Sequence, residues 1–169
     1  KAVSFQDLGT YLTLLLQKVK NGIEGALSLN NGIPPTYFYY EVEAYEPLRG
    51  VDGEPLRDEQ QRSYIRVLRF QQKVLPIFLE GVVRRYKMLP EPVAARRLYQ
   101  QVKNSVLYDR PLKMYRTNAP LENQPFQIGR LKAFTPGWLE NESIFLHMEY
   151  KYLLELLRAG LHDEFFEDF

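Results

Sequence analysis

The spacing of apolar residues predicts a helix near the start of the chain. Ser4 can cap its first turn, and Asp7, three residues later, can bond back to the Ser4 backbone. Asn30-Asn31-Gly32 ends the helix near Leu29, and Pro34-Pro35 prevents its continuation. The apolar residues recur every three or four positions, as on one face of a helix: Leu8, Tyr11, Leu12, Leu15, Val19 and Ile23.

Two further helical stretches occupy the middle of the chain. The first spans about Asp58 to Leu89, with a break just before Pro76, because proline lacks the N–H group and clashes with the preceding turn; Pro90 ends it. The second begins at Pro92 and runs to about Ser105. Its spacing turns four residues inward: Val93, Leu98, Val102 and Val106.

The last strongly patterned helix is expected from about Asn141 to Ala159. Gly160 closes it, and a short helix follows from Leu161 to Phe169. Its apolar face is wide and comprises Ile144, Phe145, Met148, Tyr152, Leu153, Leu156 and Leu157.

Three segments do not have the helical pattern. Thr36–Tyr45 is rich in aromatic and β-branched residues and is expected to be a strand or extended. Leu48–Arg57 is a turn or loop, since it contains Gly50, Asp52-Gly53 and Pro55. Tyr108–Gly137 is loop-rich, with a short strand at Lys113–Thr117, and such a long loop is either functional or packed. The pattern predicts a mainly α fold, with residues 1–169 forming a single helical region.

The composition excludes several classes of protein. The net charge of +1 gives no overall attraction to nucleic acid or to an anionic membrane. No apolar run reaches the roughly 20 residues needed to cross a bilayer, and no signal peptide is recognisable. The absence of cysteine fits a cytoplasmic protein. The chain starts at Lys1 rather than Met and stops within an amphipathic run, which favours a piece of a longer protein over a chain trimmed to its ordered part.

Common catalytic and metal-binding motifs are also missing. His147 and His162 lie on different expected elements, and there is no His-x-x-x-His pair or cysteine cluster, so no metal site is predicted. The chain contains no glycine-rich phosphate loop and no Gly-x-Ser-x-Gly nucleophile elbow.

The strongest candidate site surrounds the start of the last helix. Trp138, Glu140, Asn141, Glu142 and His147 lie within ten residues of one another. Each has a structural alternative: a tryptophan that plugs the core, acids that complement the helix dipole, an asparagine cap and a satisfied histidine. Together they offer a flat apolar face and carboxylates for a sugar, and a histidine beside a helix N-terminus for an anion such as phosphate.

The aromatic segment Tyr37–Tyr45 has two interpretations. Its rings can stack on sugars, or they can pack against the helices as an ordinary apolar segment. Glu41, Glu43 and Glu46 alternate with the rings, so one face is solvated and nucleic acid is disfavoured as a ligand. Together with the leucine-rich last helix, the segment can also form the binding surface of a non-catalytic module for a protein or glycan partner.

The run from Gly137 to His147 resembles a segment of the cellobiose phosphorylase family and its large bacterial relatives. In that family a Glu-Asn pair precedes a hydrophobic helix that carries an aromatic residue and then a His, matched here by Glu140, Asn141, Phe145 and His147. The likeness extends to Ala133–Pro136 before the run and to Glu149–Leu157 after it, and more loosely to Gly32–Tyr40.

This resemblance implies part of an (α/α)6-barrel catalytic domain of an inverting glycoside phosphorylase or hydrolase. The substrates would be β-linked oligosaccharides and inorganic phosphate, with no cofactor. It assigns His147 to phosphate, and Trp138, Glu140 and Asn141 to the sugar. The family's acid motif, an Asp with adjacent Trp and Asn, does not occur here, so the general acid stays unknown and the chain is expected to be inactive alone.

Overall fold

The computed structural model describes residues 3–89 and 91–169. The break expected at Pro90 therefore lies outside the described residues. The contacts divide the chain into two compact units. One unit comprises Tyr37–Leu75, and the other comprises the chain up to Thr36 and from Pro76 onward.

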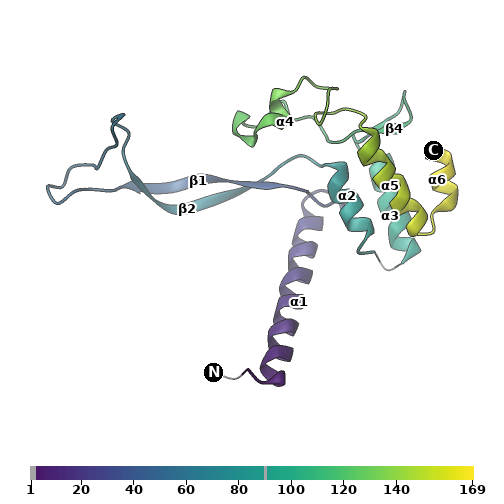
Figure 1. Ribbon diagram of the computed structural model, residues 1–169, viewed down its shortest axis with the longest axis horizontal. Helices are drawn as coiled ribbons and strands as arrows, with labels where there is room; N and C mark the ends of the chain where they lie inside the picture. Colours follow the sequence, from purple (N-terminus) through teal and green to yellow (C-terminus); the bar gives the residue numbers. More distant parts are fainter. Residues whose placement is uncertain (1–2, 90) are drawn as a thin grey trace. The chain divides into compact units, whose positions relative to one another are not determined.

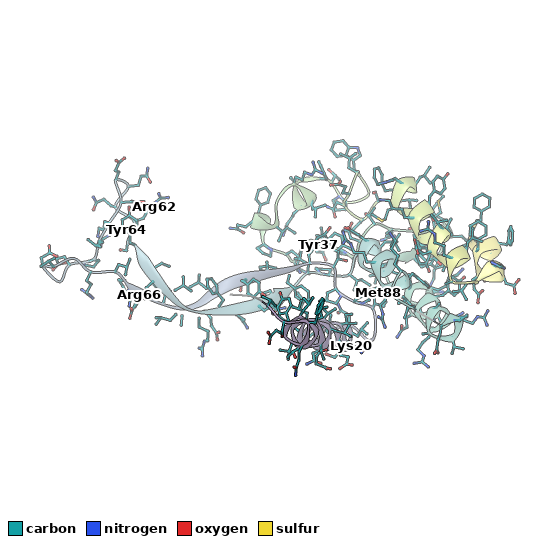
Figure 2. All side chains as sticks on the ribbon, turned by 60° about the horizontal axis from the view of Figure 1, so that its bottom comes forward. Lys20, Tyr37, Arg62, Tyr64, Arg66 and Met88 are labelled. Atoms are coloured by element: carbon teal, nitrogen blue, oxygen red, sulfur yellow. The ribbon has the colours of Figure 1, made fainter. Side chains whose placement is uncertain are left out.

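The unit Tyr37–Leu75 is a long β-hairpin (Figure 1). Strand β1 (Phe38–Pro47) pairs antiparallel with β2 (Ile65–Val74), and the register shifts on either side of Ala44. Turns between the strands form the tip, from which the side chains of Arg62 and Tyr64 project (Figure 2). Three solvent-exposed ion pairs cross between the strands: Glu41–Lys73 at 3.7 Å, Glu43–Arg69 at 2.9 Å and Glu46–Arg66 at 3.1 Å.

The hairpin confirms one expectation and contradicts another. Strand β1 confirms that Thr36–Tyr45 is largely extended, but the helix expected from Asp58 to Leu89 is wrong, because Ile65–Val74 is strand β2 and only Leu79–Tyr86 is helical. Arg66, Arg69 and Lys73 pair with acids of β1, and such pairing depends on residues distant in sequence. A boundary does lie before Pro76, but it ends strand β2 at Val74 and does not break the expected helix.

Helix α1 (Phe5–Ser28) forms as the sequence predicts. The Asp7 N–H donates to Ser4 Oγ at 3.0 Å, and the Ser4 N–H donates to Asp7 Oδ2 at 3.1 Å, which completes the capping box. The residue after its last turn is Leu29. None of its described side chains is buried, so its apolar stripe faces solvent in the structure.

The core of the helical unit lies among α2 (Leu79–Tyr86), α3 (Pro92–Lys103), α5 (Leu146–Arg158) and α6 (His162–Asp168), which gather together in Figure 1. Helix α3 presents Ala95, Leu98, Tyr99 and Val102 to the core. The inward placement expected for Val93 and Val106 is wrong, since these side chains are 72% and 56% exposed. They lie off the buried stripe, whose members follow one another at i, i+3, i+4 and i+7.

The remaining elements are short. Strands β3 (Tyr108–Asp109) and β4 (Met114–Tyr115) pair with each other, which confirms a short strand within Lys113–Thr117. The 3₁₀ helix η1 (Phe126–Ile128) and helix α4 (Arg130–Ala133) follow. Gly160, at φ +76°, separates α5 from α6, as predicted from its sequence position.

The expected fold class is wrong. The described residues are 43% helical and 20% strand, with two small antiparallel sheets and six α-helices, so they form a mixed α/β structure and not a mainly α part of an (α/α)6 barrel. The error in the fold class comes chiefly from Ile65–Val74, which the apolar spacing assigned to a helix and which is a strand. A search of the described residues finds no helix with the length and hydropathy of a membrane span.

Four tyrosines are buried in the core, namely Tyr86, Tyr99, Tyr115 and Tyr152. The ring of Tyr152 lies 4.5 Å from Tyr115 and 5.8 Å from Tyr86, measured between centroids. Burial raises the pKa of Tyr99 to about 12, and it also raises the pKa values of Tyr86, Tyr115 and Tyr152. The folded chain therefore keeps these four protons at a pH where an unfolded chain releases them.

We expect the free energy of unfolding to fall as pH rises above about 10, the ordinary tyrosine pKa. Each raised pKa adds stability that is complete below the unfolded value and is lost at higher pH, by up to about 1.4 kcal/mol per pH unit for each tyrosine. Urea unfolding at a series of pH values measures this slope. Tyr99→Phe should make it shallower and Tyr150→Phe, an exposed control, should not; equal slopes in all three proteins would contradict the explanation.

Candidate functional site

A tight turn presents Trp138 to solvent. The Gly137 N–H donates to the Asn141 carbonyl oxygen at 2.7 Å, and the Asn141 N–H donates to the Trp138 carbonyl oxygen at 3.2 Å. Gly137 has φ +87°, a region that favours glycine. These bonds fix the backbone on both sides of Trp138, so the indole sits on an ordered loop.

The indole of Trp138 is the main exposed aromatic surface of this turn. Its side chain is 59% exposed, and its ring meets Phe134 edge to face, with centroids 5.5 Å apart. An edge-to-face contact holds the orientation of the indole and leaves ring area available for another planar or apolar surface. The alternative of Trp138 as a core plug does not fit this exposure.

Asn141 and Glu140 have different environments in the same turn. Asn141 is 3% exposed, and its Nδ2 donates to the Phe134 carbonyl oxygen at 2.8 Å, so its amide ties the turn to the preceding segment. The Glu140 carboxylate pairs with Arg130 at 3.2 Å, and the two side chains are 41% and 75% exposed. Such an exposed pair adds little stability, so Glu140 can exchange Arg130 for a ligand.

The start of the last helix differs from the expectation. Helix α5 begins at Leu146 with Phe145 at its N-cap, so Asn141 does not cap it and Glu140 and Glu142 are outside its first turn. Instead, Ile144 forms a β-bridge with Arg116, and the Thr117 N–H donates to the Ser143 carbonyl oxygen at 2.9 Å. This pairing holds the segment before Phe145 extended and delays the helix.

His147 lies on the first turn of α5, exposed and edge to face with Phe145 at 6.0 Å. The first helical backbone bonds are donated by Met148 and Glu149 to the Phe145 carbonyl oxygen. Among the described residues no backbone acceptor is recorded for the Leu146 and His147 N–H groups, which are therefore open to an anion. The structure brings Trp138, Glu140 and Asn141 together in one turn, whereas His147 belongs to the next element.

A hollow of about 360 Å³ opens beside the Trp138 turn, with Gly137 in its wall. Arg116 is its central charged group. The guanidinium donates to Asp109 Oδ2 at 2.8 Å and lies 4.0 Å from Glu142 Oε2. The hydrogen bond from Arg116 is the main reason that the pKa of Asp109 lies below its usual range. A hydrogen bond from the Leu112 N–H lowers it further. The hollow thus combines two carboxylates and a guanidinium.

Asn118 supports the wall of the hollow from within the fold. It is fully buried, and its Oδ1 accepts the Glu142 N–H at 3.0 Å and the Thr117 hydroxyl at 2.8 Å. Its Nδ2 donates to the Ala119 carbonyl oxygen at 2.9 Å. One amide therefore joins the Thr117–Ala119 segment to the segment that carries Glu142.

Sequence reasoning did not find Asp109, Arg116 or Asn118 as site residues. The available signal was the long loop Tyr108–Gly137, recognised as functional or packed but without assigned residues. Glu149 has the raised carboxyl pKa that often marks a site, because burial disfavours its charge, but its Oε1 accepts the buried Tyr115 N–H at 3.0 Å. Its side chain is enclosed in the core and does not line the hollow.

Comparisons of the chain with protein-family models, with curated proteins and with solved structures find no match.

Within residues 3–89 and 91–169, no group of three or more metal-ligating side chains is close enough together to hold an ion.

Proposed function

We propose that this chain is the carbohydrate-binding part of a glycoside phosphorylase-like enzyme that acts on β-linked oligosaccharides with inorganic phosphate. The proposal depends mainly on one observation: the exposed Trp138 directly follows Gly137, which lines a hollow containing Asp109, Arg116 and Glu142. Sugars present apolar C–H faces and a rim of hydroxyl groups, so a site for them combines an aromatic face with charged hydrogen-bonding groups.

Each group in the site has a distinct role in this proposal. Trp138 stacks on a sugar face, while Glu140 and Glu142 accept bonds from hydroxyl groups. Arg116 donates to hydroxyl oxygens from the position in which Asp109 holds it. Asn141, being buried, positions Trp138 through its bond to Phe134 rather than touching the sugar.

Phosphate is assigned to His147 and the open N–H groups at the start of α5. A helix N-terminus favours anions, because its backbone N–H groups and the helix dipole both point toward the ligand. The imidazole of His147 adds a donor on the same exposed turn.

The proposed site binds substrate but does not supply the complete chemistry. An inverting mechanism requires a carboxylic acid on one face of the sugar and the attacking group on the other. Asp109 is a poor general acid, because its contact with Arg116 lowers its pKa. The proposal therefore places the acid elsewhere in a longer protein, and the cytoplasmic location expected from the sequence stays a prediction.

The second candidate is a non-catalytic protein- or glycan-binding module. It is favoured by the hairpin, whose Tyr40, Leu68 and Phe70 side chains are each more than half exposed. A two-stranded hairpin has little stability of its own in water, so exposed apolar side chains on it fit a surface that a partner covers.

Binding measurements with cellotetraose and inorganic phosphate test the proposed function. Trp138→Ala should weaken cellotetraose binding about tenfold, since the stacked ring contributes about 1.5 kcal/mol. His147→Ala should weaken phosphate binding and leave cellotetraose binding unchanged. Tyr150→Ala is the matched control, because Tyr150 is another aromatic side chain that is more than half exposed.

Titration calorimetry on the whole chain measures both affinities. Equal loss from Trp138→Ala and Tyr150→Ala, or unchanged affinity in Trp138→Ala, would contradict the assignment of Trp138. Unchanged phosphate affinity in His147→Ala would contradict the assignment of His147. Binding of sugar without phosphate would favour the non-catalytic module.

A further inference from the structure

A second concave surface lies between α2 and α5, and the proposed carbohydrate site does not use it. The groove has a volume of about 790 Å³. One wall follows α2 and the two residues after it, through Val83, Arg84, Lys87 and Met88, and the other follows α5 from Met148 to Arg158. Residues on each wall recur at the three- and four-residue spacing of a single helix face, so the groove runs along both helices.

The floor and edges of the groove expose apolar side chains. Met88, which Figure 2 labels, is 51% exposed, and Leu154 is 43% exposed. Met148 is half-buried against the core. Methionine side chains are flexible and polarizable, so they adapt to an apolar surface that enters the groove.

The charged residues of the groove are mainly basic. Four cations line it, Arg84, Lys87, Lys151 and Arg158, against two acids, Glu80 and Glu155. Glu80 pairs with Arg84 at 2.5 Å, and Glu155 pairs with Arg158 at 2.7 Å. Lys87 and Lys151 have no ion-pair partner among the described residues, and they stand on opposite walls. The groove therefore presents an excess of two positive charges around an apolar floor.

The dimensions of the groove suit a short helix. The α5 wall from Met148 to Arg158 rises about 15 Å at 1.5 Å per residue, which equals nearly three helical turns. A helix of that length presents two or three apolar side chains on one face, with flanking positions for charged residues. This arrangement complements a groove with an apolar floor and a lysine on each side.

The geometry points to the α2–α5 groove as the docking site of an acidic amphipathic helix from a partner protein. Large apolar side chains of the partner enter between Met88 and Leu154, and its carboxylates flank them and pair with Lys87 and Lys151. A flat anionic membrane would not fill a concave groove. The inference is independent of the proposed carbohydrate function.

The test uses the whole chain and three 14-residue synthetic peptides. Each peptide has three leucines on one helical face and glutamates on both flanks, and the three differ in the register of the leucines. Fluorescence anisotropy measures the affinities. We expect at least one peptide to bind, its affinity to fall with added salt, and its analogue with glutamine for glutamate to bind about tenfold more weakly.

Paired charge reversals identify the groove. Lys87→Glu with Lys151→Glu should weaken binding about tenfold or more, since it replaces attraction by repulsion on both walls. Arg97→Glu with Arg110→Glu is the matched control, because it changes the net charge by the same amount at exposed residues outside the groove. Met88→Ser should also weaken binding, and as a half-exposed position it should leave the fold intact.

Four outcomes would overturn the inference. The first three are failure of all three peptides to bind, equal affinity for the glutamine analogue, and equal loss of affinity from the two paired charge reversals. The fourth is that the chain binds phosphatidylserine vesicles and that the Lys87 and Lys151 reversals abolish this binding but leave peptide binding unchanged. Circular dichroism of each variant checks that the helices are retained.

Discussion

Replacing Asp168 by alanine is expected to lower the free energy of unfolding by about 3 kcal/mol. Lys103 then keeps only the more exposed Glu167 carboxylate, at 3.2 Å, and the buried Tyr115 hydroxyl loses its acceptor. The Asp168 side chain is only 1% exposed and the Lys103 side chain 17% exposed. Asp168 accepts bonds from Lys103 and, at 2.5 Å, from the Tyr115 hydroxyl. Urea unfolding followed by circular dichroism measures the loss.

The environment of Lys103 explains the size of this effect. Burial alone would lower its pKa, but its bonds to Asp168 and to the Tyr99 hydroxyl outweigh burial and hold the pKa above its ordinary value. The ammonium thus stays charged within the folded unit, with Asp168 as its buried partner and Glu167 as a second, more exposed one. The same pair connects α6 to α3, which lie far apart in the sequence.

Two variants separate the ion pair from a general effect of changing α6. Asp168→Asn keeps an oxygen acceptor and the side-chain volume, so its loss should be smaller than that of Asp168→Ala. Asp163→Ala changes an exposed carboxylate in the first turn of the same helix and should cost about 0.5 kcal/mol through the helix dipole. Equal losses from Asp168→Ala and Asp163→Ala would show that the buried pair is not the cause.

The second large effect is expected from Asn118→Ala. This change removes the acceptor for the Glu142 N–H and the donor to the Ala119 carbonyl oxygen, both within a fully buried junction. Leaving such groups unsatisfied should cost about 2–3 kcal/mol. Because the junction also places Glu142 beside Arg116, we expect cellotetraose affinity to fall together with stability.

Asn104→Ala serves as the control for Asn118→Ala. Asn104 is exposed just after the last turn of α3, so its replacement should change the free energy of unfolding by less than about 0.5 kcal/mol. The cellotetraose affinity is measured without urea, where both variants are folded. A loss of affinity under these conditions comes from the displacement of Glu142 and not from unfolding of the chain. A normal stability of Asn118→Ala would contradict the role given to this amide.

Local sequence signals predicted several elements correctly. The Ser4–Asp7 pair marked the start of α1, Pro92 marked the start of α3, and Gly160 marked the boundary between α5 and α6. Each signal acts through a backbone group within a few residues, so its effect is the same whatever the rest of the chain does. Trp138, Glu140 and Asn141 were expected side by side at the start of the last helix, and the structure places them in one turn before it.

Tertiary pairing decided the elements that the sequence analysis missed. Ile65–Val74 has apolar residues compatible with either a helix or a strand, and pairing with β1 selects the strand. Ile144 pairs with Arg116, and this delays α5 until Leu146 and removes Asn141 from the cap position. Local propensities differ by about 1 kcal/mol per residue or less, so a series of cross-strand contacts outweighs them.

The sequence by itself therefore determined the start of α1 at its Ser4–Asp7 cap, the start of α3 at Pro92 and the boundary at Gly160, and it identified the turn that carries Trp138. Only the tertiary structure placed Asp109, Arg116 and Glu142 around one hollow and joined Lys103 to Asp168. The physical reason is that capping and turn formation involve neighbours in the chain. The hollow and the buried ion pair, in contrast, exist only after segments separated by tens of residues have packed together.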